Sequence, residues 1–62
     1  MKTYVVLTPG GDFMGNAETP EEIVLYAIAR ANLVAETFVV YDHDLNRFEV
    51  PRPRPQDEPT VG

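Results

Sequence analysis

The sequence contains no cysteine, no serine and a single histidine, His43. Without cysteine the chain forms no disulfides and no thiolate zinc sites, and without serine or cysteine it lacks the usual nucleophiles of covalent catalysis. One imidazole does not by itself make a recognisable transition-metal site. We therefore expect no enzymatic activity, no cofactor and no bound metal.

Basic residues are also scarce, with five Lys and Arg against ten Asp and Glu and a net charge of −5. Because neutralising phosphate groups requires clustered Lys and Arg, we expect no direct binding to nucleic acid and none to a membrane. The apolar run within residues 1–7 is too short for a signal-peptide core or a membrane span. These features predict a soluble, cytoplasmic protein.

The chain is short, at 62 residues. A domain of this size buries only about 60% of the surface that its unfolded chain exposes, so its stability margin is thin. Oligomerisation is a common remedy in small domains without disulfides or metals. We expect one domain over residues 1–50, a Pro-rich extended tail over residues 51–62, and a homo-oligomer, with a dimer favoured.

Strand-forming residues occupy the range 3–8 and end at Pro9-Gly10, a pair that suits the two central positions of a type II turn. Residues 12–17 are rich in glycine, asparagine and aspartate and are expected to form a loop. Two later ranges, 37–41 and 47–50, are separated by turn-forming residues and predict a β-hairpin.

The segment Thr19-Pro20-Glu21-Glu22 predicts the start of a helix, because threonine caps, proline suits the first turn and Glu22 completes a capping box. We expect this helix to run to about residue 33 or 35. The resulting fold class is α+β, a small β-α-β-β domain with one helix packed on a three-stranded sheet. A helical crossover favours a parallel arrangement of the first two strands, with an antiparallel arrangement as the alternative.

The helix has more apolar surface than one contact requires. At 100° per residue, one arc between residues 23 and 35 faces the core. A second patch lies on the far side and combines apolar residues with an aromatic residue and an arginine, a composition typical of protein interfaces. The alternative is that loop residues cover this patch inside a monomer. The predicted interface residues are Leu25, Tyr26, Ala29, Arg30 and Leu33.

The predicted strands alternate in a way that leaves both faces of the sheet apolar. One helix covers only one face, so the other face requires the tail, a second chain or a docked partner. The tail over residues 51–62 favours extended polyproline II structure and is either a recognition segment or a solvated end.

The segment 42–46, Asp-His-Asp-Leu-Asn, begins like a calcium-binding loop, with oxygen ligands at alternate positions. Arg47 stands where such a loop needs glycine, and Pro53 where it needs a glutamate. A hairpin turn closed by aspartate and asparagine side chains explains the same residues.

These observations predict a small non-enzymatic protein-interaction module that self-associates through an apolar helix or sheet surface. Short acidic chains without cysteine are frequent among accessory proteins of phages and mobile elements, and we expect a role of that kind. The alternative is an acidic inhibitor or nucleic-acid mimic that blocks a basic groove on another protein. Its candidate carboxylates are Asp12, Glu18, Glu21, Glu22 and Glu36.

Overall fold

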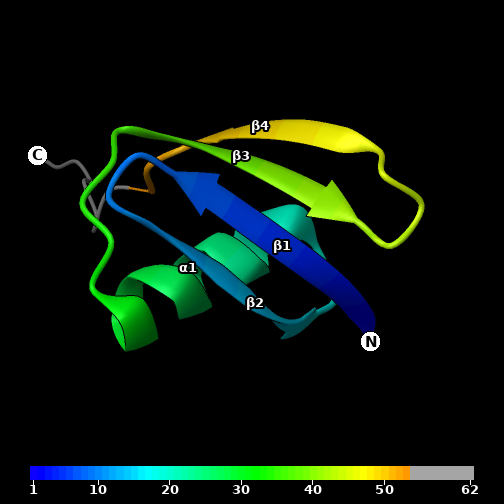
Figure 1. Cartoon of the computed structure of the whole chain (residues 1–62). Helices are drawn as coiled ribbons and strands as arrows, with labels where there is room; N and C mark the ends of the chain where they lie inside the picture. The colour runs from blue at the N-terminus through cyan, green and yellow to red at the C-terminus, as the bar shows by residue number, and fades with distance from the viewer. Residues whose placement is uncertain (54–62) are drawn as a thin grey trace, which may run out of the picture.

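The structure, a computed structural model, describes residues 1–53. These residues form one helix and a four-stranded antiparallel sheet in the order β2-β1-β3-β4, with the helix against one face (Figure 1). The elements are β1 (Lys2–Thr8), β2 (Gly11–Ala17), α1 (Pro20–Ala31), β3 (Thr37–Asp42) and β4 (Arg47–Pro51). The α+β class is confirmed. The predicted three-stranded sheet in β-α-β-β order is wrong, because the expected loop over residues 12–17 belongs to strand β2.

Strand β2 follows β1 through a two-residue connection, and the two strands pair from Thr8–Gly11 to Lys2–Ala17. The positive φ in this turn lies at Gly11, at 147°, and not at Gly10. A type II turn over Pro9-Gly10 needs a positive φ at Gly10, so that prediction is wrong. The Thr8 hydroxyl donates a hydrogen bond to the Gly11 carbonyl and helps to close the turn.

The extra strand also changes the direction in which β3 runs relative to β1. Strand β2 reverses the chain, α1 runs back along the sheet, and β3 reverses the chain again beside β1. As a result β1 and β3 pair antiparallel, with Val6 opposite Val40. The favoured parallel arrangement is therefore wrong, and the antiparallel alternative is confirmed.

Helix α1 begins as predicted. Thr19 is the N-cap and its hydroxyl accepts a hydrogen bond from the Glu22 backbone N–H at 3.1 Å, while the Glu22 carboxylate accepts one from the Glu18 N–H at 2.7 Å. The helix ends earlier than expected, at Ala31. Asn32 adopts the left-handed conformation with a φ of 57°, and its N–H donates to the Ile28 carbonyl, a usual way for asparagine to end a helix.

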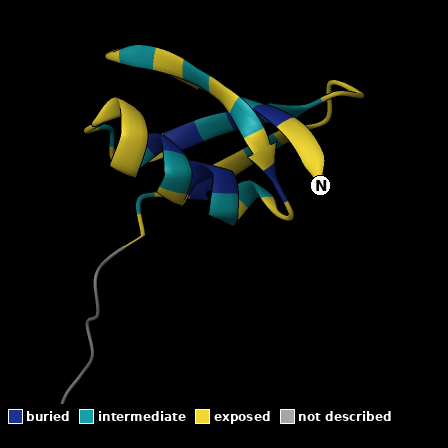
Figure 2. Ribbon diagram, turned by 90° about the horizontal axis from the view of Figure 1, so that it is seen from below, coloured by how far each residue is buried: buried dark blue, intermediate teal, exposed yellow. Residues whose placement is uncertain are grey.

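The core lies between α1 and the face of the sheet that the helix covers, where the buried segments gather in Figure 2. Alternation along each strand decides which side chains enter it, so Tyr4 and Val6 of β1 are buried while Val5 and Leu7 face the other way. The core residues are Tyr4, Val6, Ala17, Ile23, Val24, Ala27, Leu33, Phe38, Val40 and Val50.

Arg52 fastens the end of β4 to the segment that joins α1 to β3. Its guanidinium Nη1 donates to the carbonyl oxygens of Leu33, at 3.0 Å, and Ala35, at 3.3 Å, and its backbone N–H donates to Glu36 O at 2.7 Å. The first two residues of the predicted tail, Pro51 and Arg52, are thus part of the fold. Residues 54–62 of that tail lie outside the described residues.

The two turn glycines give a matched test of this hairpin. Gly11→Ala should lower the free energy of unfolding by about 1–3 kcal/mol, because a φ of 147° disfavours any side chain. Gly10→Ala should be neutral or stabilise by up to about 1 kcal/mol, since an added Cβ there meets no atom within 4 Å. Urea denaturation of both variants measures the difference; equal effects would contradict the turn geometry.

Arg52→Gln should lower the free energy of unfolding by about 1–2 kcal/mol, because it removes two charge-assisted hydrogen bonds to carbonyl groups. Arg47→Gln is the control, since the Arg47–Glu49 pair is exposed and should contribute less than about 1 kcal/mol. Urea denaturation under the same conditions compares them. A smaller loss for Arg52→Gln than for Arg47→Gln would show that the Arg52 contacts do not hold the fold.

Candidate interaction surfaces

The face of the sheet opposite α1 is not covered by any part of residues 1–53. The strand register places its side chains in two rows that cross the sheet from β2 to β4. Each row has apolar residues on the central strands β1 and β3. The rows are Asp12–Leu7–Val39–Glu49 and Met14–Val5–Tyr41–Arg47.

The centre of this uncovered face is apolar and its rim is mostly polar. Leu7 is 38% exposed, Met14 is 69% exposed, and Val5, Val39 and Tyr41 are half-buried. On the β4 side the rim carries an ion pair, in which Arg47 Nη2 lies 2.8 Å from Glu49 Oε2. An apolar patch with a polar rim is the usual composition of a protein interface.

The structure divides the helix patch that the sequence predicts as an interface. Leu25 and Ala29 are on the solvent side of α1, where Leu25 is 51% exposed. Tyr26 is half-buried at the edge of the core, and the Arg30 guanidinium carbon lies over its ring, 5.7 Å from the centroid. Leu33 lies beyond the helix end and is buried. The five residues therefore do not form one exposed patch.

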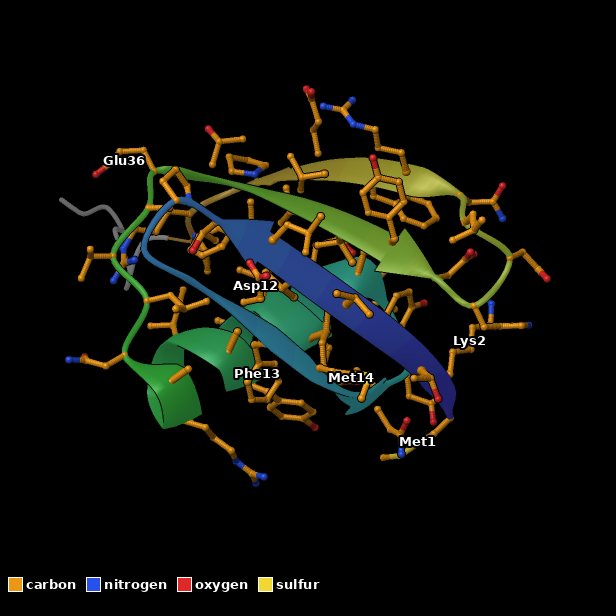
Figure 3. The ribbon with its side chains drawn as sticks, in the orientation of Figure 1. Met1, Lys2, Asp12, Phe13, Met14 and Glu36 are labelled. Carbon is orange, nitrogen blue, oxygen red and sulfur yellow. The ribbon has the colours of Figure 1, made fainter. Side chains whose placement is uncertain are left out.

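An open groove of about 490 Å³ runs between β2 and α1. Its apolar lining includes Phe13, Ile23 and Tyr26, and Arg30 is the only arginine or lysine in the lining. Met1 also lines the groove, and its N-terminal ammonium lies 3.9 Å from Glu18 Oε2. Figure 3 labels Phe13 and Met14 at adjacent positions of β2, where the strand register directs Phe13 to the helix side and Met14 to the uncovered face. This groove was not predicted, because residues 12–17 are a loop in the sequence-based prediction. The signal for a strand is the alternation in residues 11–17, where small or apolar residues alternate with Asp12, Met14 and Asn16.

The segment 42–46 forms the turn between β3 and β4. The Asp42 carboxylate accepts hydrogen bonds from the backbone N–H groups of Asp44 and Asn46, both at 2.9 Å, and from the Asn46 side-chain amide at 3.0 Å. Leu45 adopts the left-handed conformation, with a φ of 66°. Hydrogen bonding within the turn therefore accounts for these aspartate and asparagine residues without a metal.

The candidate carboxylates of the acidic-inhibitor alternative lie at separate places. Glu18, Glu21 and Glu22 lie at the start of α1, and Glu36 follows the end of the helix. In Figure 3, Glu36 lies at the opposite end of the molecule from Met1 and Lys2, and Asp12 lies on β2. Of the five candidate carboxylates, only those of Glu18, Glu21 and Glu22 are close in the sequence and lie at the same end of the helix.

The chain matches no protein-family model, and comparisons with curated proteins and with solved structures found no significant match. Within the described residues, the structure has no helix with the length and apolar character that crossing a membrane requires.

The Asp42 turn should make stability depend on pH in the acid range. The Asn46 side-chain amide, followed by the backbone N–H groups, stabilises the carboxylate and holds the pKa of Asp42 below its ordinary value of 3.8. This stabilisation is complete above pH 3.8 and is lost as the pH falls through the lower pKa of the folded state. Denaturation between pH 7 and 2 should show a shallower loss of stability on the acid side for Asp42→Ala than for wild type. Equal slopes for the two proteins would contradict this role of Asp42.

Proposed function

We propose that this protein is a small non-enzymatic interaction module that self-associates through the uncovered face of its sheet. The observation that carries the proposal is the apolar centre of that face, formed by Val5, Leu7, Val39 and Tyr41 on the two central strands. A second copy is the occupant, and two independent arguments support that choice.

The first argument is the area that the face offers. Four strands at about 4.8 Å spacing and about 20 Å length present roughly 400 Å² in projection. Allowing for side-chain relief, two copies packed face to face bury roughly 1,000 Å² in total, which is at the lower end of specific interfaces. Because each copy has its own buried core, we propose a reversible dimer with a dissociation constant on the order of micromolar and not an obligate one.

The second argument is charge complementarity about a two-fold axis. Two identical faces meet when the axis lies in the plane between them. A two-fold axis perpendicular to the strands would place β4 over the partner's β4. Arg47 would then face the partner's Glu49, and Glu49 would face the partner's Arg47. An axis along the strands places β2 over the partner's β4 and brings Asp12 towards the partner's Glu49, two like charges. We propose the first orientation, in which the ion pair exchanges between copies.

The helix is the weaker candidate for the interface. With Leu33 in the core and Tyr26 half-buried, the outward apolar surface of α1 reduces to Leu25 and Ala29. Two side chains give far less apolar area than the uncovered face, and area is what an apolar interface requires.

Leu7→Glu should abolish self-association, because it puts a charge in the middle of the proposed interface at a side chain that points away from the core. Leu25→Glu is the control and should leave the dimer intact. Light scattering with a concentration series from micromolar to millimolar measures the molar mass, and circular dichroism verifies that both variants are folded. A wild-type monomer at millimolar concentration would overturn the proposal, and loss of the dimer only in Leu25→Glu would assign the interface to the helix.

A further inference from the structure

The two edges of the sheet are not equivalent. The connection between β1 and β2 closes on the pair Thr8–Gly11, and the residues of an antiparallel strand direct their backbone groups alternately towards and away from its neighbour. The N–H and C=O groups of Asp12, Met14 and Asn16 therefore point away from β1. These three alternate residues of β2 direct their backbone hydrogen-bonding groups outwards, where a further strand would pair.

The other edge, on β4, is protected. The β3–β4 register directs the backbone groups of Arg47, Glu49 and Pro51 outwards. Pro51 has no N–H to donate, and the Arg47–Glu49 ion pair lies along the same strand. Charged residues and proline are usual features that prevent pairing at an exposed edge. Of the two edges, β2 is the one that favours strand addition.

The groove between β2 and α1 adjoins this free edge. An added strand would direct alternate side chains to the helix side of the sheet, and therefore into the groove. At Gly15 the Phe13 ring and Ile23 form an apolar surface against the backbone of the strand, because a Cβ there would lie only 3.1 Å from the Phe13 ring and 3.2 Å from Ile23 Cδ1. Within residues 1–53, Arg30 forms no ion pair, and it holds its guanidinium over the Tyr26 ring.

Helix α1 fixes the positions of these features along β2. Ile23, near the helix start, lies beside Gly15, whereas Leu33, just beyond the helix end, lies beside Gly11. Arg30, in the last turn of the helix, is therefore nearest the Gly11–Phe13 end of the strand. The groove thus offers an apolar position opposite Gly15 and a cationic position opposite Phe13, two residues apart on the same side of the strand.

We propose that the β2 edge binds an extended peptide segment of another protein, which adds antiparallel to β2 as a fifth strand. Its recognition pattern is an apolar side chain opposite Gly15 and, two residues later, a single carboxylate that pairs with Arg30. Charge complementarity limits the partner to one carboxylate, because the rest of the chain is acidic, with a net charge of −5. Backbone pairing supplies affinity and the alternate side chains supply specificity, as in other cases of strand addition.

The probe is the synthetic peptide acetyl-Thr-Leu-Val-Glu-Thr-amide, titrated into ¹⁵N-labelled full-length protein and followed by NMR. The expected result is a set of amide shifts centred on Asp12, Met14 and Asn16, with few on β4. The matched peptide with glutamine in place of glutamate should bind about five-fold more weakly, as expected for one partly exposed charge pair. In Arg30→Gln the two peptides should bind equally.

Lys2→Gln is the control, because it removes the same charge at a residue outside both the groove lining and the uncovered face, and it should keep the preference for glutamate. A loss of preference in both variants would indicate only the overall charge and would overturn the proposal, as would the absence of β2 shifts at millimolar peptide. Slow hydrogen exchange at Asp12, Met14 and Asn16 in concentrated protein without peptide would assign this edge to a second copy instead. Repeating the titration on Leu7→Glu, which should not self-associate, tests peptide binding independently of the sheet-face dimer.

Discussion

One helix has to cover a sheet that is wider than itself. Helix α1 has 12 residues, so it is about 18 Å long and, with side chains, about 10 Å across. Four strands at about 4.8 Å spacing are about 19 Å wide. Because the helix is narrower than the sheet, it leaves space beside β2 on its own face. Within residues 1–53 it is also the only helix, so the opposite face has no cover. The uncovered face and the groove both follow from having one helix on a four-stranded sheet.

Within that limit the chain still forms a closed core, because its largest buried side chains meet in one place. Phe38, Ile23 and Val6 are fully buried. Arg52 ties β4 to the segment after the helix through three backbone carbonyl groups, so the last strand and the helix end are held together. A small domain with few such ties has a thin stability margin, and burial of surface in the proposed dimer would increase that margin.

The sequence was sufficient to predict the helix start and those strands whose local residue preferences agree with the conformation that they adopt in the fold. The strands at residues 3–8, 37–41 and 47–50 and the Thr19 cap were predicted because β-branched residues and capping residues act locally. Strand β2 was missed because Gly11, Gly15 and Asn16 have low strand propensity, and its pairing with β1 outweighs that propensity. Gly15 is tolerated there because the Phe13 ring and Ile23 occupy the space of its missing side chain.

The predicted position of Leu33 on the helix surface is wrong, because the helix ends before this residue. The helix was extended to residue 33 or 35, which placed Leu33 on its surface, whereas Asn32 ends the helix and turns Leu33 into the core. The uncovered sheet face was anticipated from strand alternation alone, since alternation depends only on the pleat. The groove was not, because it requires knowledge that β2 exists and that the helix lies beside it.

Met14 connects the two proposed surfaces. It lies at one end of a row on the uncovered face, and its backbone groups point to the free edge of β2. A strand added at that edge would widen the uncovered face by about 4.8 Å, or roughly a quarter, and would place its own outward side chain beside Met14. If both copies of the proposed dimer carried an added strand, the enlarged faces would bury more area, so peptide binding and self-association would favour each other reciprocally.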